Sequence, residues 1–267
     1  MSNHLPHPGR APSLHIASDN GSGPAVLLVH GIASSATTFD PVLPLLGGHR
    51  AIAVDLLGFG RSPAPLNSDY TIDDHVAFLE RTIEDVRVEG PIVVVGHSMG
   101  SLIVARLAAR NPSLVHGVVL VSPPVYLPPE ILSNRTDRAT MGLYLRIYEF
   151  LGNNRDFSVS AAQAIAQFLP REGLLHLDEH DWRPFALSLR HCIESQTTID
   201  DISNITAPIE VIYGALDPLM LREGLHIVSR MRNVHTEKIS GADHIVRERL
   251  ARAIADAVNR VSSPVGP

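Results

Sequence analysis

The apolar residues of the chain form short continuous runs, which alternate with longer segments whose apolar positions recur at helical spacing. The short runs are rich in Val, Ile and Leu, which is typical of strands buried on both faces of a parallel sheet. This pattern predicts strands at residues 25–29, 50–55, 92–95, 115–121, 209–213 and 234–239, with an edge strand at 13–17.

Helices are predicted in most of the intervals between these strands. From Ile72 to Val86 an apolar residue recurs every three or four positions, and the helix that follows residue 98 ends where Asn111 precedes a proline. Further helices are expected at 37–46, after residue 218, and in the terminal segment to about residue 261. Regular alternation of strands and helices predicts an α/β fold, with a mostly parallel central sheet flanked by helices.

Residues 123–201 interrupt this alternation. They contain no buried β run, and helices are predicted at 143–151, 159–169 and 184–199. We therefore expect an α/β core made of residues 1–122 and 202–267, with an inserted helical cap at 123–201. The segment is rich in aromatic residues and methionine, and some of these side chains are expected to face a substrate pocket.

Composition narrows the range of partners. Hydrophobic residues make up 45% of the chain, the formal net charge is −6, and no basic residues cluster, which disfavours nucleic acid and anionic membranes as partners. No apolar run is long enough to span a membrane, and the single cysteine, Cys192, can form no internal disulfide. The first 23 residues contain no apolar h-region, so we expect no secretory signal. We expect a cytoplasmic protein that acts on a small molecule, and its oligomeric state stays open.

The strongest motif is Gly96-His97-Ser98-Met99-Gly100, between a predicted buried strand and a predicted helix. In that context, G-x-S-x-G predicts a sharp turn that lifts the Ser98 hydroxyl above the sheet at a helix N-terminus. Small residues are needed on either side because the strand and the helix pass close to each other. Without catalytic partners the same pattern would fit an ordinary glycine-rich turn.

A second turn, His30-Gly31-Ile32, follows another predicted strand. In hydrolases built on such a serine turn, the loop after this strand and the residue after the serine each donate a backbone N–H to the reacting oxyanion. The donors here would be Ile32 and Met99. Without Ser98, this segment would be a plain connection.

Asp217 and His244 each follow a predicted strand, so they lie at the same sheet edge as Ser98. His244 can accept the Ser98 proton, and Asp217 can orient the imidazole and stabilise its cation. Asp243 is a weaker choice because it directly precedes the histidine and should point away from it.

Two other motifs are assigned no chemistry. The glycines in Asp55-Leu-Leu-Gly58-Phe-Gly60-Arg61 lack the third glycine and the helix of a dinucleotide site, so they are expected to fix a tight loop. Residues 176–180 read H-x-x-E-H, but little regular helix surrounds them, and a solvated polar turn is expected rather than a zinc site.

With serine, aspartate and histidine in this order along the sequence, the chain resembles the α/β-hydrolase fold superfamily. The segments that carry this resemblance are His30-Gly31, residues 55–62, Gly96–Gly100, Gly214–Asp217 and Gly241–His244. The chain is similar to cofactor-free esterases, lactonases, perhydrolases and meta-cleavage-product hydrolases. The resemblance implies hydrolysis of an ester, thioester or lactone of a mostly apolar molecule, with no cofactor and no metal.

Two alternatives stay open. C–C bond hydrolases usually carry Asn before the nucleophile and an aromatic residue after the catalytic histidine, where this chain has His97 and Ile245. Some superfamily proteins act instead as ligand receptors. In C–C hydrolases an arginine on the returning cap helix holds a substrate carboxylate, a role that Arg190 could take unless it simply pairs with Glu194. The candidate substrate contacts are His30, His97, Tyr144, Trp182, Arg190 and Ile245.

Overall fold

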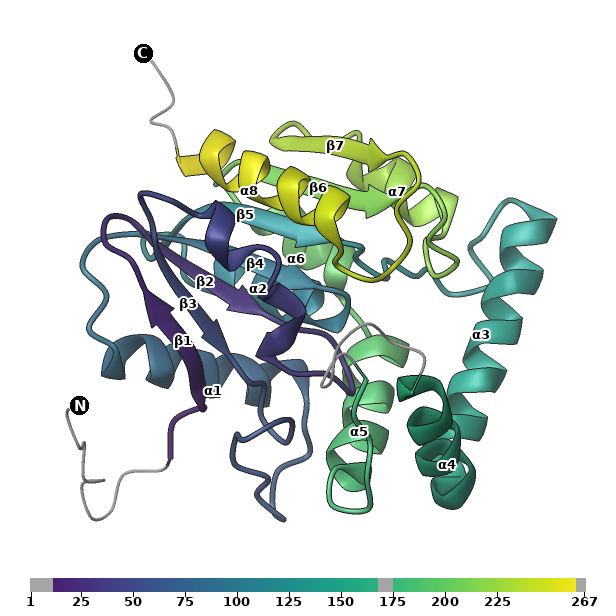
Figure 1. Cartoon of the computed structure of the whole chain (residues 1–267). Helices are drawn as coiled ribbons and strands as arrows, with labels where there is room; N and C mark the ends of the chain where they lie inside the picture. Colours follow the sequence, from purple (N-terminus) through teal and green to yellow (C-terminus); the bar gives the residue numbers. More distant parts are fainter. Residues whose placement is uncertain (1–11, 168–174, 263–267) are drawn as a thin grey trace.

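The computed structural model describes residues 12–167 and 175–262, and its centre is a seven-stranded sheet (Figure 1). The strand order is β1-β3-β2-β4-β5-β6-β7, and every neighbouring pair is parallel except β1 and β3. The bounds are β1 Ile16–Asn20, β2 Ala25–Val29, β3 Arg50–Val54, β4 Ile92–His97, β5 Val115–Val121, β6 Ile209–Gly214 and β7 Val234–Ile239.

Helices cover both faces of the sheet. Helix α8 (Glu248–Ser262) packs on one face, across β4 to β7, as Figure 1 shows. On the other face α2 (Met99–Arg110) packs against β4 and β5, with α1 (Ile72–Asp85) and α6 (Thr198–Asn204) packed against α2; α7 (Arg222–Val228) packs against α6. Each face has its own apolar core, because the side chains of each buried strand alternate between the two.

Most strand predictions are confirmed to within a residue or two. The strands predicted at 25–29, 115–121 and 234–239 have those bounds in the structure. The edge strand runs from Ile16 to Asn20 instead of 13–17, because its only neighbour is β3 and apolar periodicity says little about a strand exposed on one side.

The helix predicted at 37–46 is wrong. The structure has only two short 3₁₀ turns there, Ala36–Phe39 and Leu43–Leu45. Pro41 and Pro44 lack the N–H groups that a continuous α-helix would need, so helical spacing of the apolar residues does not produce a helix.

Between β5 and β6, the described residues contain helices and no strand. These are α3 (Arg135–Asn153), α4 (Arg155–Ala166), α5 (Trp182–Ser188), the π-helix η3 (Leu189–Glu194) and α6. The helices predicted at 143–151 and 159–169 therefore begin earlier than expected, and the predicted end at 169 lies outside the described residues. The single helix predicted at 184–199 is wrong, because residues 195–197 separate η3 from α6. In Figure 1, α3 and α4 stand to one side of the sheet.

The helical segment between β5 and β6 contacts the loop after β3 at a glycine. Gly58 has φ +80°, and a Cβ there would lie 2.5 Å from Cβ of Pro184 in α5. No described helix is long and apolar enough to cross a bilayer.

Candidate active site

Ser98 occupies the sharp turn between β4 and α2, with φ +52° and ψ −124°. A side chain at Gly96 would come within 2.4 Å of the Gly100 carbonyl oxygen, and one at Gly100 within 2.3 Å of the Val29 carbonyl oxygen. The glycines of the motif are therefore required by close approach of backbone to backbone. The serine is buried and stands at the N-terminus of α2, where the helix dipole favours negative charge.

The turn after β2 crosses directly over this serine. A Cβ on Gly31 would lie 2.9 Å from Ser98 Cβ and 3.4 Å from its Oγ. Within the described residues, the N–H groups of Ile32 and Met99 donate no hydrogen bond to another protein group. Two backbone donors next to the hydroxyl are thus available to a ligand oxygen, which is the arrangement that an oxyanion hole requires.

Asp217 and His244 meet at the carboxyl end of β6 and β7. His244 Nδ1 lies 2.8 Å from Asp217 Oδ2, and Leu219 N–H donates to Oδ1 at 3.0 Å. Burial alone would raise the pKa of Asp217, but the contact with His244 and the backbone hydrogen bond from Leu219 outweigh burial and hold that pKa below its usual range. Because Asp217 bonds Nδ1, Nε2 of the imidazole remains available as a base.

The structure does not join all three groups. Among the described residues, no hydrogen bond links Ser98 Oγ to His244, so the acid–histidine contact is formed and the histidine–serine contact is not. Contacts between a nucleophile and its base often tighten only when substrate is bound. Asp243 faces away as expected, with Oδ2 2.7 Å from Arg247 Nη1.

His97 and His30 are buried, and both bind backbone groups. His97 Nε2 donates to the His244 carbonyl oxygen at 2.8 Å. His30 Nδ1 donates to the Gly31 carbonyl oxygen at 2.7 Å, and its Nε2 accepts from Leu56 N–H at 2.8 Å. Burial lowers the pKa of His30 to about 4 and that of His97 to about 3, so both rings are neutral. We assign them to positioning the two loops that flank Ser98.

The loop at residues 55–62 supports the same region. Asp55 Oδ1 accepts from Ala36 N–H, and Oδ2 accepts from Arg61 N–H, both at 2.9 Å. A Cβ on Gly60, which has φ +56°, would lie 2.5 Å from the Asp55 carboxyl group. The prediction that these residues fix a tight loop is confirmed.

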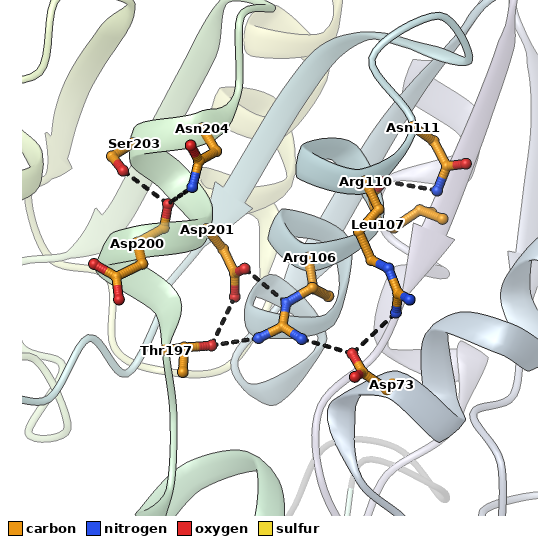
Figure 2. Close-up of polar contacts among 10 residues, drawn as sticks. All are labelled: Asp73, Arg106, Leu107, Arg110, Asn111, Thr197, Asp200, Asp201, Ser203 and Asn204. Carbon is orange, nitrogen blue, oxygen red and sulfur yellow. Dashed lines mark hydrogen bonds and ion pairs between the residues drawn. The ribbon is translucent and has the colours of Figure 1, made fainter.

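An arginine fixes the far half of helix α2. Figure 2 shows Arg106 between three partners: Nε donates to Asp201 Oδ1 at 2.6 Å, Nη1 donates to Asp73 Oδ1 at 2.6 Å, and Nη2 donates to Thr197. Arg110 also reaches Asp73, at 3.1 Å. Helix α2, which presents Ser98 at its first turn, is thereby tied to α1 and α6.

Three tyrosines connect the helical segment between β5 and β6 to the Asp217 loop. Tyr144 on α3 donates to the Pro218 carbonyl oxygen, and Tyr126 donates to that of Leu219 at 3.3 Å. The hydroxyls of Tyr126 and Tyr148 lie 2.9 Å apart. Sequence reasoning selected only Tyr144, as a substrate contact. No spacing in the sequence could reveal the cluster, because its members are joined only through the fold.

The remaining candidate substrate contacts lie in different settings. Trp182 is half-buried, with its ring centroid 5.7 Å from that of Phe185. Ile245 lines an open cavity of about 470 Å³ together with Pro41 and residues 241–243 and 246–250; His244 is not part of that lining. Arg190 is exposed on η3. Among the described residues, no hydrogen bond or ring contact joins any of these three side chains to Ser98.

Comparison with known proteins agrees with the α/β architecture described above. A family model described as the alpha/beta hydrolase fold matches residues 24–246. The chain is 29% identical over 247 residues to 2-(acetamidomethylene)succinate hydrolase of Mesorhizobium japonicum, which covers 86% of this chain and 84% of that protein. It is 29% identical over 256 residues to Esterase Rv0045c of Mycobacterium tuberculosis, covering 90% and 83%.

Other similarities are partial or concern the fold alone. Probable lysophospholipase BODYGUARD 3 of Arabidopsis thaliana is 40% identical over 110 residues, and the match covers 39% of this chain and 22% of that protein. The match spans about a quarter of the length of each of these plant relatives. The crystal structure of E-2-(acetamidomethylene)succinate hydrolase superposes with a TM-score of 0.65 at 24% identity, covering 91% of this chain and 93% of that one.

Proposed function

The chain belongs to the α/β-hydrolase fold family, and on that premise we propose that it hydrolyses an ester, thioester or lactone of a mostly apolar small molecule through an acyl-serine intermediate. The observation that carries the proposal is the Asp217–His244 pair, 2.8 Å apart at the sheet edge where Ser98 stands on its strained turn. An aligned acid and imidazole beside a serine at a helix N-terminus supply the parts of nucleophilic acyl transfer.

The reaction proceeds in two steps. His244 Nε2 takes the hydroxyl proton as Ser98 Oγ attacks the substrate carbonyl, and the protonated imidazole returns that proton to the leaving oxygen or sulfur. Water, deprotonated by the same imidazole, then attacks the acyl-serine; the bond from the acyl carbon to Ser98 Oγ breaks, the imidazole returns the proton to Oγ, and the acid is released. Ile32 and Met99 N–H groups bind the oxyanion in both steps, and each such donor contributes about 3 kcal/mol to transition-state stabilisation.

We also propose that residues 123–201 form a cap over this site. The contact between Pro184 and Gly58 and the tyrosine contacts with Pro218 and Leu219 support this role, because they join the helical segment to the loops around the triad. A cap of aromatic residues suits a substrate with a large apolar part.

A second candidate is hydrolysis of a carboxylate-bearing substrate, including C–C bond cleavage. The likeness to 2-(acetamidomethylene)succinate hydrolase over 86% of the chain favours it, because that relative's name describes a succinate derivative. The two candidate substrates, one apolar and one carrying a carboxylate, differ in whether a positively charged side chain must face the bound substrate.

The test is turnover of a panel of p-nitrophenyl esters, lactones and vinylogous diketones by the full chain and by Ser98→Ala. We expect turnover of an ester or lactone, and a fall in kcat of roughly 10⁴-fold or more in Ser98→Ala with the fold retained. Ser203→Ala, an exposed serine on α6, is the matched control and should retain activity. A protein that binds a panel compound without turnover, equally well in Ser98→Ala, would be a receptor.

A further inference from the structure

Three side chains converge at the turn before α5, outside the proposed triad. They are His176, Asp178 and Asp181, and one ligand atom of each lies within 4.8 Å of the other two. His176 Nε2 lies 3.5 Å from Asp178 Oδ2 and 3.4 Å from Asp181 Oδ2. Imidazole nitrogen and carboxylate oxygen are the ligand types that Zn²⁺ and similar cations take.

The spacing fits a bound cation better than a hydrogen bond. A nitrogen donor and a carboxylate oxygen in direct contact normally lie about 2.7–3.2 Å apart. Two ligand atoms that each lie about 2.05 Å from a tetrahedral Zn²⁺ are separated by about 3.3 Å, which is the edge of the tetrahedron. Both distances from His176 Nε2 are close to that edge.

Asp181 supplies a second, independent observation. Its side chain is only 9% exposed, and within the described residues its carboxylate accepts no hydrogen bond from outside this trio. Among the described residues, the basic side chain at contact distance is the imidazole of His176, and the carboxylate of Asp178 lies beside the same imidazole nitrogen. Taking most of a carboxylate out of water without a hydrogen-bond donor from outside the trio is costly, and a cation held by Asp181 and the two further ligands would offset that cost.

Asp178 is oriented for the same purpose. Its Oδ1 accepts the backbone N–H groups of His180 and Asp181, at 2.7 and 3.0 Å. These bonds fix the side chain with Oδ2 toward His176. The other members of the H-x-x-E-H sequence do not take part, since Glu179 pairs with Arg155 at 2.7 Å. The sequence expectation of a plain polar turn rested on that motif, whereas the converging set includes Asp181, which lies outside it.

We propose that His176, Asp178 and Asp181 bind one divalent transition-metal cation, best matched by Zn²⁺, with water as the remaining ligand. Mg²⁺ and Ca²⁺ fit less well, because they take six or more oxygen ligands and only two carboxylates are present. The cation anchors the start of α5 and takes no part in the chemistry at Ser98.

The site is linked to the proposed oxyanion loop. His176 N–H donates to the Ala33 carbonyl oxygen at 2.8 Å, and Ala33, at φ +50°, directly follows Ile32. A cation that fixes the 176–181 turn therefore also fixes the cap segment against the loop that carries one oxyanion donor. Loading the site should stabilise the folded chain, because the cation binds the folded state and not the unfolded one.

The experiment uses the tag-free full chain, stripped with a chelator and titrated with Zn²⁺ by calorimetry. We expect one tight site per chain, a higher Tm on Zn²⁺ addition, and much weaker responses to Ca²⁺ and Mg²⁺. His176→Gln and Asp181→Asn should each raise Kd by roughly 10- to 100-fold or more. His176 is exposed, so its variant keeps the proposal testable even if Asp181→Asn folds poorly.

The matched controls are His180→Gln and Glu179→Gln, which change neighbouring residues of the same turn outside the trio. Both should bind Zn²⁺ like the parent chain. The proposal is overturned if the parent chain shows no stoichiometric Zn²⁺ site, or if His180→Gln weakens binding as much as His176→Gln does, since the ligands would then be a different set.

Discussion

His97 Nε2 donates a hydrogen bond to the carbonyl oxygen of His244 at 2.8 Å, so the residue before the proposed nucleophile holds the backbone of the proposed base. The centroids of the two imidazole rings lie 5.0 Å apart. Since Nε2 carries the proton, Nδ1 of His97 is unprotonated, and it is buried without a partner among the described residues. His97 therefore fixes the position of the His244 backbone through this hydrogen bond and is not itself a base.

Removing the hydrogen bond from His97 to the His244 carbonyl oxygen should lower kcat. His97→Phe keeps an aromatic ring of similar size and removes the donor, so His244 loses its fixed position relative to Ser98. We expect kcat to fall by roughly 10²-fold with a much smaller change in KM, because misplacement of about 1 Å has costs of that order. His97→Gln, whose amide can donate to the same carbonyl, should recover most of the loss. Equal loss in both variants would contradict the positioning role.

Three buried histidines should make the protein sensitive to acid. Burial lowers the pKa of His30 to about 4 and the pKa values of His75 and His97 to about 3. The unfolded chain takes up these protons near pH 6.5, so the stability contributed by the neutral rings is complete above that pH and is lost as pH falls toward the folded pKa values. Between pH 7 and 5.5, the loss is roughly 1 kcal/mol per histidine.

Urea unfolding across this pH range measures the effect. His75→Gln removes one titrating ring while keeping a group that can reach Ser188, so the slope of unfolding free energy against pH should decrease by about one proton. An unchanged slope would mean that His75 is protonated equally in both states.

Gly31 offers a test of the oxyanion loop. In Gly31→Ala the new methyl group would lie 2.9 Å from Ser98 Cβ, so either the loop or the serine must shift. We expect kcat to drop by roughly 10²-fold, which is the effect of losing one oxyanion donor. Gly47→Ala is the control, because a Cβ there meets nothing within 4 Å. Steady-state kinetics with matching circular dichroism spectra would decide, and an unchanged kcat in Gly31→Ala would separate this loop from the chemistry.

The strands were predictable where both of their faces are buried. Residues 25–29 and 118–121 are each an uninterrupted run of Ala, Val and Leu, because the layers above and below the sheet bury both faces of these strands. Helix α3 was placed too late because its first turns are largely exposed and polar. Its start is set by Asn134, whose side chain accepts the N–H groups of Thr136 and Asp137, a cap that apolar periodicity does not register.

The candidate site also contains residues that the sequence predicts and contacts that it does not. Ser98, Asp217 and His244 could be selected from the sequence because each follows a strand at the sheet edge. The supporting contacts could not be predicted, since His97 binds a backbone carbonyl 147 positions away. Asp181 likewise joins His176 only because the turn between them brings the two side chains together.

Arg106 should contribute measurably to stability. Its side chain is 20% exposed and that of Asp201 is 11% exposed, so Arg106→Met leaves a mostly buried carboxylate without its partner (Figure 2). We expect the free energy of unfolding to fall by about 1–3 kcal/mol, less than for a fully buried pair. Arg110→Met, at an exposed position that contacts the same Asp73, should cost less than about 0.5 kcal/mol. Equal losses would show that Asp201 is satisfied by Thr197 alone.

Arg190 separates the two candidate substrate classes. It lies exposed on the π-helix η3, and its charge lowers the pKa of Glu194, although burial raises that pKa more. An arginine that serves a neighbouring carboxylate on its own helix is not held for a substrate. We therefore expect Arg190→Met to change kcat/KM by less than about twofold, and equally, for a matched pair of substrates that differ only in a carboxylate.

The opposite outcome has a distinct signature. If Arg190 reaches the bound substrate, its guanidinium fork pairs with the carboxylate, and truncation leaves that charge unpaired in the complex. kcat/KM for the anionic substrate alone would then fall by the equivalent of about 2–4 kcal/mol, while the neutral ester would be nearly unaffected. A selective loss of that size would contradict the exposed, structural role and favour a carboxylate-bearing substrate. Equal small changes would leave the apolar acyl substrate as the function that the site supports.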